Sequence, residues 1–306
     1  MRTIVEIEKY TPGAPAAVTV GTFDGVHLGH QELLKRVIHW AREQGLMATV
    51  VTFDPHPKKV VGKDPQSLRV LTDLDEKLEV FSTFDLDQVV IIQFTREFAR
   101  LSYEEFVDRY LVQRLQVKAM VVGYDHHFGR NREGGFEQLQ SLGKRYGFQV
   151  EQLGPFTVDG EVVSSSRIRE LLTRGEVDKV ARFLGRPYRI RGTVVQGQGL
   201  GKQLGFPTAN IQVNNPEKII PVRGVYAVDV RVGGRLYKGM MNIGHRPTVN
   251  FVPLTLEVHL FNFRNSIYGE TVDVFFKQFI RQETKFPSLE ALKRQLEEDK
   301  KVCLNI

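Results

Sequence analysis

The stretch GTFDGVHLGHQELLKRV, residues 21–37, places three glycines and two histidines directly in front of a strongly periodic helical pattern. It continues from AAVTVGTF, residues 16–23, which is rich in β-forming side chains. His27 and His30 are therefore expected where a strand gives way to a helix. Because unpaired N–H groups concentrate at a helix N-terminus, such a junction binds phosphate well. The sequence predicts an anion site here.

Strand-like and helix-like segments alternate up to about residue 153. After the helical pattern that follows His30 come the predicted strands LMATVVTF, DQVVIIQF and VKAMVVG. The helical SYEEFVDRYLVQRLQ precedes the last of these strands. This alternation predicts an α/β domain in which helices wrap a Rossmann-like parallel sheet. Ligands of such sheets bind at the carboxyl ends of the strands, where the histidine stretch is expected.

The pattern changes after Gly185. The predicted strands are RIRGTVVQG, GVYAVDVRV, RLYKGMMNIG, LTLEVHLFNF and TVDVFFKQF, with Gly233-Gly234 as a tight turn. A terminal helix, SLEALKRQLEEDKKV, begins with Ser288 as its N-cap. We expect a first domain at residues 1–184, ending in the helical SRIRELLTRGEVDKVARFLG. We expect a second domain at residues 185–306, a small antiparallel β-barrel with a C-terminal helix.

Charge is unevenly placed along the 306 residues, whose net charge is +6. Residues 1–184 contribute −2 and residues 185–306 contribute +8. A basic second domain suggests an anionic ligand, either a nucleotide phosphate or a nucleic acid. The single cysteine, Cys303, excludes an intrachain disulfide, and no apolar run is long enough for a signal peptide or a membrane span. A cytoplasmic protein without a membrane partner is expected.

Two histidines three residues apart on the first turn of a helix point toward the same space. His27 and His30 could therefore hydrogen-bond to an α-phosphate as negative charge builds on it during nucleotidyl transfer. Gly21, Gly25 and Gly29 would let the nucleotide approach the backbone closely. A zinc pair is the rival interpretation, but two histidines without a nearby third ligand make a poor zinc site.

The stretch VSSSRIR, residues 163–169, offers hydroxyls at a helix start and two arginines, which suit the β- and γ-phosphates of ATP. Taken alone, it would be a serine N-cap followed by exposed arginines. Together with GTFDGVHLGH it resembles the H-x-G-H nucleotidyltransferase superfamily, which joins a phosphorylated metabolite to the AMP part of ATP. With TFDPHP and VVGYDHHFGR added, the chain resembles the FMN adenylyltransferase domain of bacterial bifunctional flavin enzymes.

This resemblance implies that His27 and His30 are catalytic and that FMN reacts with ATP to give FAD and pyrophosphate. The residues that it implies for ATP and FMN binding are Gly21, Phe23, Gly29, Asp125, Ser164, Ser165, Ser166 and Arg169. The chain departs from the family pattern at two positions. Ser166 stands where threonine is usual, and His126 stands where an aromatic residue is usual.

The second domain contains GQGLGKQLGFPTANI, residues 197–211. Its spacing does not fit a Walker loop, but a glycine-rich flap with one lysine can wrap ATP phosphates through backbone N–H groups and the ammonium. Thr208 and Asn210 would face the same way in an extended segment, where their oxygens suit Mg²⁺. The residues expected to bind ATP here, and flavin by the resemblance described next, are Gly197, Gly199, Gly201, Lys202, Thr208 and Asn210.

Glu257 and His259 alternate onto one face of the strand LTLEVHLFNF. A carboxylate there could be the general base for phosphoryl transfer, although a strand glutamate taken singly is more often a solvated surface residue. In this order, GFPTAN, MNIGHRPT, EVHLFNF and YG resemble the riboflavin kinase domain. The resemblance implies that Thr208 and Asn210 bind Mg-ATP and that Glu257 activates the ribityl 5′-hydroxyl of riboflavin.

The two resemblances together predict a bifunctional riboflavin kinase and FMN adenylyltransferase. Riboflavin, FMN and FAD are its substrates or products, ATP is the co-substrate and Mg²⁺ is the metal. Two alternatives stay open: an adenylyltransferase for another phosphorylated metabolite with a degenerate barrel, and an RNA-binding protein that uses the basic barrel. The barrel sequence lacks clustered aromatics in an RNA-binding pattern, so we expect no nucleic-acid partner.

Overall fold

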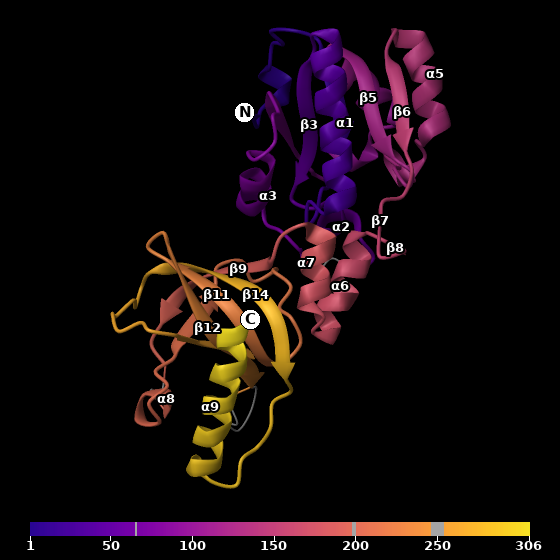
Figure 1. Ribbon diagram of the computed structural model, residues 1–306. Coiled ribbons are helices and arrows are strands. Elements are labelled where there is room, and N and C mark those ends of the chain that lie inside the picture. The colour runs from indigo at the N-terminus through magenta and orange to yellow at the C-terminus, as the bar shows by residue number, and fades with distance from the viewer. Residues whose placement is uncertain (65, 198–199, 246–253) are drawn as a thin grey trace. The chain divides into compact units, whose positions relative to one another are not determined.

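The computed structural model describes residues 1–64, 66–197, 200–245 and 254–306. These form two compact units, residues 1–164 and residues 165–306 (Figure 1). The first unit holds a parallel sheet with helices and the second an antiparallel barrel with a C-terminal helix, so the predicted fold class is confirmed. The domain boundary after residue 184 stays a prediction, because the division into compact units falls 20 residues earlier and leaves residues 165–184 with the barrel.

The first unit contains, within its described residues, a six-stranded parallel sheet in the order β1-β4-β3-β2-β5-β6. Its strands are β1 (Arg2–Ile4), β2 (Ala16–Val20), β3 (Met47–Asp54), β4 (Gln88–Gln93), β5 (Val117–Gly123) and β6 (Gln149–Leu153), and the hairpin β7 (Thr157–Val158) and β8 (Glu161–Val162) follows. Its helices are α1 (Leu28–Gln44), α2 (Pro57–Val61), α3 (Leu74–Phe81), α4 (Tyr103–Phe106) with a π-helical continuation (Val107–Val112), and α5 (Phe136–Tyr146). Short 3₁₀ turns lie at Ile7–Lys9, Phe98–Arg100 and Arg130–Arg132.

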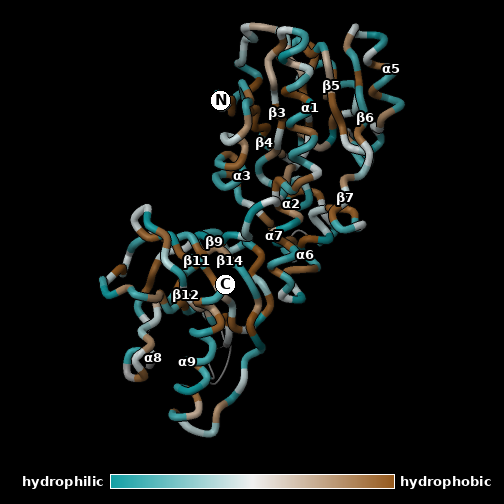
Figure 2. The backbone as a smooth tube through the Cα atoms, viewed as in Figure 1, coloured by the Kyte–Doolittle hydropathy of each residue, from teal (hydrophilic) through white to brown (hydrophobic). Residues whose placement is uncertain are grey.

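Helices cover both faces of this sheet, so β2 is buried along its whole length. Successive strand residues face opposite sides. On one side, Ala17 lies in the apolar cluster that includes Leu34 of α1. On the other side, Val18 lies in the cluster that includes Phe106 of α4 and Leu139 of α5. Burial on both faces explains why the strands read as apolar runs in the sequence, which Figure 2 shows as brown segments.

The predicted elements differ from the structure at a few ends. The strand expected over residues 16–23 stops at Val20, because Phe23 and Val26 have φ angles of 49° and 39°, which a strand cannot contain. The single helix expected before Gly185 is two helices, α6 (Ser165–Arg174) and α7 (Val177–Leu184), because Gly175 has a φ of 80°. No counterpart was predicted for strands β1, β6, β7 and β8 or for helices α2, α3 and α5.

The second unit contains a closed antiparallel barrel with strand order β10-β13-β12-β11-β14-β9 in the part of the chain that the structure describes. Its strands are β9 (Tyr188–Val195), β10 (Ala209–Val213), β11 (Gly224–Val232), β12 (Arg235–His245), β13 (Leu254–Leu260) and β14 (Thr271–Arg281), and its remaining helices are α8 (Leu200–Gln203) and α9 (Leu289–Asn305). Gly233 and Gly234, both with positive φ, form the predicted turn between β11 and β12.

The C-terminal helix α9 begins as predicted, because the Ser288 hydroxyl accepts a hydrogen bond from the Ala291 N–H at 3.1 Å. It is fixed to the barrel by an ion pair. The guanidinium of Arg281, at the end of β14, donates two hydrogen bonds to the buried Asp299 carboxylate through Nε and one through Nη2. Cys303 of α9 is buried with Phe206 and Phe261, so the helix also packs against the segment just before β10.

Candidate active sites

The histidine stretch lies at the point where the strand order of the parallel sheet reverses. The chain runs from β2 through β3 and β4 toward one edge, whereas β5 and β6 extend from β2 toward the other edge. Parallel sheets bind ligands at this switch point, outside the carboxyl ends of the strands. The loop after β2 and the loop after β5 both begin there. The second loop approaches α1, since a Cβ built on Gly123 would lie 3.5 Å from Asp125 Oδ1 and 3.9 Å from Leu33 Cδ1.

His27 and His30 lie together at the start of α1. His27 is the N-cap residue, and its Nδ1 accepts a hydrogen bond from the backbone N–H of His30 at 3.3 Å. The two rings stack with their centroids 3.6 Å apart, and the ring of Phe23 meets His30 edge-on at 5.2 Å. Because Nδ1 of His27 accepts, a neutral His27 ring carries its proton on Nε2, which makes that atom a hydrogen-bond donor. The pair can thus present a donor beside a helix N-terminus.

Gly29 leaves room for this arrangement. A Cβ built there would lie 3.3 Å from His27 Nδ1 and 3.4 Å from Phe156 Cβ. The contact with His27 Nδ1 is tighter than ordinary van der Waals distance, and the contact with Phe156 is at its lower limit. The glycine therefore allows the capping histidine and the chain before β7 to lie against the first turn of α1.

Asp24 holds the loop that leads to His27, although no sequence pattern distinguished it as a site residue. Its carboxylate is buried, and Oδ1 accepts hydrogen bonds from the N–H groups of Leu71 at 2.9 Å and Thr72 at 3.1 Å. The Thr72 hydroxyl in turn accepts from the Gly25 N–H at 2.9 Å. These bonds stabilise a loop with three positive φ angles, at Phe23, Gly25 and Val26.

Lys77 of α3 lies under the same loop with its side chain buried. Its ammonium donates to the Thr52 hydroxyl at 3.3 Å, and that hydroxyl donates to the Thr22 carbonyl at 3.3 Å. Burial lowers the pKa of Lys77, and the carboxylates of Asp24, Asp54 and Asp73 oppose this shift. No sequence motif distinguished Lys77, because its partners come from distant segments.

The other residues predicted for adenylyl transfer are placed as follows. Gly21 follows β2 and its N–H donates to the Val51 carbonyl at 3.0 Å, Phe23 is fully buried beneath His30, and Asp125 is exposed after β5. Ser164 is the last residue of the first unit, whereas Ser165, Ser166 and Arg169 belong to α6 in the second unit. The structure thus brings His27, His30, Phe23 and Gly29 together within one unit.

The second candidate site lies on the barrel wall around Glu257 of β13. The Thr208 hydroxyl donates to Glu257 Oε2 at 3.4 Å. Asn210 of β10 is the cross-strand partner of Glu257 on one side, and Asn242 of β12 is its partner on the other. Directly opposed side chains on neighbouring strands lie within contact range. Thr208, Asn210 and Glu257, which the sequence singled out from separate motifs, are brought together.

The glycine-rich segment before β10 packs against this cluster. A Cβ built on Gly197 would overlap the amide of Asn210, and one on Gly201 would overlap the Phe206 carbonyl. Gly201 and Lys202 belong to the short helix α8, and Lys202 is exposed. Gly199, also predicted to bind ATP, lies outside the described residues. The close approach at Gly197 explains why a glycine is needed beside Asn210.

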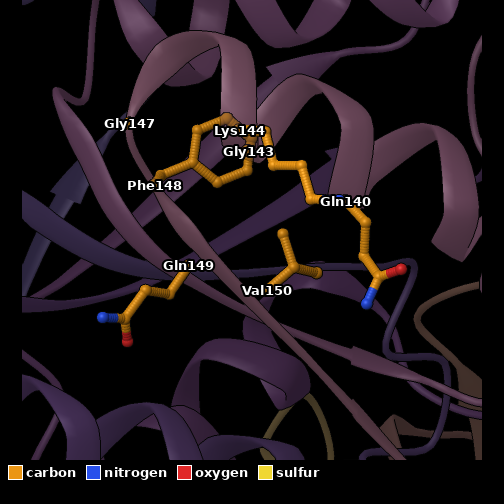
Figure 3. A pocket seen from close by; sticks show the side chains of 7 residues that line it. All are labelled: Gln140, Gly143, Lys144, Gly147, Phe148, Gln149 and Val150. Carbon is orange, nitrogen blue, oxygen red and sulfur yellow. The ribbon is translucent and has the colours of Figure 1, made fainter.

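A hollow of about 490 Å³ lies elsewhere, between the end of α5 and the start of β6 (Figure 3). Lys144 and Gln140 of α5 and Gln149 and Val150 of β6 are among its lining residues. Because it lies where β6 begins, it is at the amino-end edge of the sheet, opposite the histidines. None of the predicted site residues lines it.

Comparison with known proteins covers both units. A family model described as FAD synthetase matches residues 11–167, and one described as riboflavin kinase matches residues 184–306. A bifunctional riboflavin kinase/FMN adenylyltransferase of Haemophilus influenzae is 41% identical over 285 residues, which is 92% of this chain and 91% of that protein. The chain belongs to this family. The Listeria monocytogenes member is 39% identical over 283 residues, 92% of this chain and 89% of that protein.

The chain is thus a bifunctional enzyme that phosphorylates riboflavin with ATP and adenylylates FMN with ATP to form FAD. The predicted family and both predicted activities are confirmed. A crystal structure described as a macrolide-efflux protein from Streptococcus pneumoniae covers 100% of both chains, with a TM-score of 0.92 and 30% identity. That likeness supports the fold along the whole chain.

Neither a membrane-spanning helix nor a metal-ligating cluster occurs among the residues that the structure describes. No helix in the part of the chain that the structure describes is long and apolar enough to cross a membrane. Likewise, no group of three or more His, Cys, Asp or Glu side chains among these residues could hold a metal ion. Magnesium in ATP-dependent enzymes commonly has only one or two protein ligands, the rest being phosphates and waters.

Proposed function

We propose that the riboflavin kinase reaction takes place at the cluster of Thr208, Asn210 and Glu257. Glu257 accepts the proton of the ribityl 5′-hydroxyl, whose oxygen attacks the γ-phosphorus of ATP while ADP leaves. The hydrogen bond between the Thr208 hydroxyl and Glu257, with Asn210 in register beside them, is the observation that carries this assignment.

We propose Thr208 and Asn210 as the residues that hold Mg-ATP. Their hydroxyl and amide oxygens are hard ligands of the kind that Mg²⁺ prefers, and Glu257 adds a carboxylate next to them. When bound, Mg²⁺ neutralises phosphate charge. The segment with Gly197, Gly201 and Lys202 is proposed to cover the phosphates of ATP. Gly199, which is predicted to bind ATP as well, belongs to the same segment.

We propose that FMN adenylylation takes place at His27 and His30. An oxygen of the FMN phosphate attacks the α-phosphorus of ATP. The bond between this phosphorus and the oxygen that bridges it to the β-phosphorus breaks, and pyrophosphate leaves. The histidines stabilise the charge on the α-phosphate oxygens, with Nε2–H of His27 as one donor. The stacked ring pair at the N-terminus of α1, at the switch point of the sheet, supports this role.

The remaining assignments follow from the family resemblance. Ser164, Ser165, Ser166 and Arg169 are proposed to bind the β- and γ-phosphates of this second ATP, and Gly21, Phe23, Gly29 and Asp125 to line the ATP and FMN sites. The domain limits 1–184 and 185–306, a cytoplasmic location and the absence of nucleic-acid and membrane partners are likewise proposals.

Two variants test the assignment of the sites. His30→Ala should lower FAD formation from supplied FMN by about 10²-fold or more, as for loss of an oxyanion-type donor, while FMN formation from riboflavin is kept. Glu257→Gln preserves size and should lower FMN formation by about 10²–10⁴-fold while FAD formation from FMN is kept. Normal activity of either variant in the step assigned to its site would refute that assignment.

A further inference from the structure

His259 is buried in the barrel unit next to the proposed kinase site. It is 8% exposed, and its ring packs edge-on against Phe206 at 5.3 Å and Phe261 at 5.6 Å between ring centroids. Its Nδ1 lies 2.7 Å from the carbonyl oxygen of Pro207. A buried imidazole with one short polar contact has a defined orientation, and this contact holds the Pro207 carbonyl.

The contact also defines the tautomer of the ring. A carbonyl oxygen can only accept a hydrogen bond, so Nδ1 of His259 must carry the proton and donate it. Burial lowers the pKa of His259 and the nearby ammonium of Lys300 acts in the same direction, while the bond to Pro207 opposes them. The neutral ring with its proton on Nδ1 suffices for this contact.

Thr208 lies between two residues that are held to β13. On one side, β10 begins at Ala209, which pairs with Val258 of β13. On the other side, Pro207 has no N–H to give to a strand ladder, and its carbonyl is held by His259, the next residue of β13. The ladder thus ends at Ala209, and the imidazole extends the contact between the two segments by two residues.

We propose that His259 is a positioning residue of the kinase site, which fixes Thr208 toward Glu257 through the Pro207 carbonyl. The inference rests on the proposed function, in which Thr208 binds Mg-ATP. The role of His259 is positional, because its hydrogen bond is made to the Pro207 carbonyl. It acts on the backbone position of Thr208, whose hydroxyl must stay within reach of the Glu257 carboxylate.

Three substitutions separate this role from packing. The amide nitrogen of His259→Asn lies about where Nδ1 lies, whereas the longer side chain of His259→Gln places its amide nitrogen about where Nε2 lies. His259→Leu keeps an apolar side chain without a donor. All three lose the aromatic contacts with Phe206 and Phe261, so packing alone predicts similar defects in all of them.

The full-length variants are assayed for FMN formation over a range of Mg-ATP concentrations. His259→Asn should keep the KM for Mg-ATP within about threefold of wild type, whereas His259→Gln and His259→Leu should raise it about tenfold, as for one lost hydrogen bond. FAD formation from supplied FMN, in the same samples, should be unchanged because that reaction is assigned to the site at His27 and His30. Thermal unfolding reports any general loss of stability.

A wild-type KM in His259→Gln and His259→Leu would overturn the inference, and so would equal defects in all three variants. Thr208→Val removes the hydroxyl and keeps the shape. It separates the positioning role of His259 from the proposed binding of Mg-ATP by Thr208. If Thr208→Val raises the KM and His259→Gln does not, the positioning role is wrong and the proposed site stands. If Thr208→Val leaves the KM unchanged, the proposed ligand assignment is wrong and the inference falls with it.

Discussion

At the scale of single residues, glycines and histidines shape the two candidate sites. Gly197 has no side chain where a Cβ would overlap the Asn210 amide, and Gly29 has none where a Cβ would crowd the His27 ring. These close approaches explain why glycine-rich segments accompany both sites in the sequence. His126, the departure from the usual family pattern, stacks on Phe128 with ring centroids 5.4 Å apart. The imidazole therefore packs as an aromatic ring would.

Gly197→Ala should impair the kinase alone. The new methyl group must displace the side chain of Asn210, so the KM for Mg-ATP should rise by about tenfold, which corresponds to about 1.4 kcal/mol. Steady-state assays of FMN formation provide the measurement. Gly154→Ala is the control, since its Cβ would meet nothing within 4 Å. Equal kinetics of the two variants would show that Asn210 does not need this space.

His126 should make the first unit sensitive to acid. Burial, followed by the charges of His127 and Arg132, lowers the pKa of His126 from 6.5 to about 4. As the pH falls from about 6.5 to about 4, His126 therefore becomes protonated in the unfolded chain before it does so in the folded chain. The free energy of unfolding decreases over this range. His126→Phe should lack this loss. Chemical denaturation of both proteins at about pH 7 and about pH 5 tests it, and parallel pH dependences would contradict it.

At the scale of elements, the loop between β2 and α1 is the most constrained part of the first site. Its positive φ angles at Phe23 and Val26 each carry a backbone cost, commonly of about 1–3 kcal/mol. The buried Asp24 carboxylate and the Thr72 hydroxyl, both bonded to backbone groups, offset this cost. We therefore expect the segment around Thr72, although far from the histidines in the sequence, to determine how they are placed.

Thr72→Val and Thr72→Ser form a matched pair for this expectation. Valine keeps the shape and removes the hydroxyl that accepts the Gly25 N–H bond, which should lower the free energy of unfolding by about 1–3 kcal/mol and reduce FAD formation from FMN. Serine keeps the hydroxyl and should retain more of both. FMN formation should be equal in the two variants. If Thr72→Val forms FAD as fast as Thr72→Ser, this hydrogen bond does not position the histidines.

The elements also show what a single sequence can predict. The strand VKAMVVG matches β5 residue for residue, because burial on both faces leaves the apolar run AMVV at residues 119–122. The three-residue strand β1 gives no such signal. Among the candidate site residues, the sequence singles out His27, His30, Thr208, Asn210 and Glu257 because they lie in distinctive local motifs. Thr72 was not, because its partner Gly25 lies 47 residues away and the bond exists only after folding.

At the scale of the whole molecule, residues 165–184 raise the question of where the barrel unit begins. The family match to riboflavin kinase starts at residue 184, whereas the compact unit starts at residue 165. Within that unit α7 packs against β14 and β9, and it buries Val177, Val180 and Phe183. The Val222 N–H also donates to the Leu172 carbonyl of α6 at 3.0 Å. Residues 165–184 thus act as part of the barrel's outer packing.

Two fragments test this. Residues 184–306 should fold and form FMN by themselves, but residues 165–306 should be more stable. Each apolar side chain of α7 that is buried contributes about 1.5–3 kcal/mol, so the free energy of unfolding should be at least about 3 kcal/mol higher in the longer fragment. Urea denaturation of both fragments measures the difference. Equal stabilities would place α6 and α7 outside the barrel's core.

The central claim is that each reaction is carried out by its own site and that FMN links them. Its most direct test measures FAD formed from riboflavin and Mg-ATP by His30→Ala, by Glu257→Gln, and by an equimolar mixture of the two variants. We predict that His30→Ala stops at FMN, that Glu257→Gln leaves riboflavin unchanged, and that the mixture forms FAD. FAD formation at the wild-type rate by either variant alone would contradict the claim.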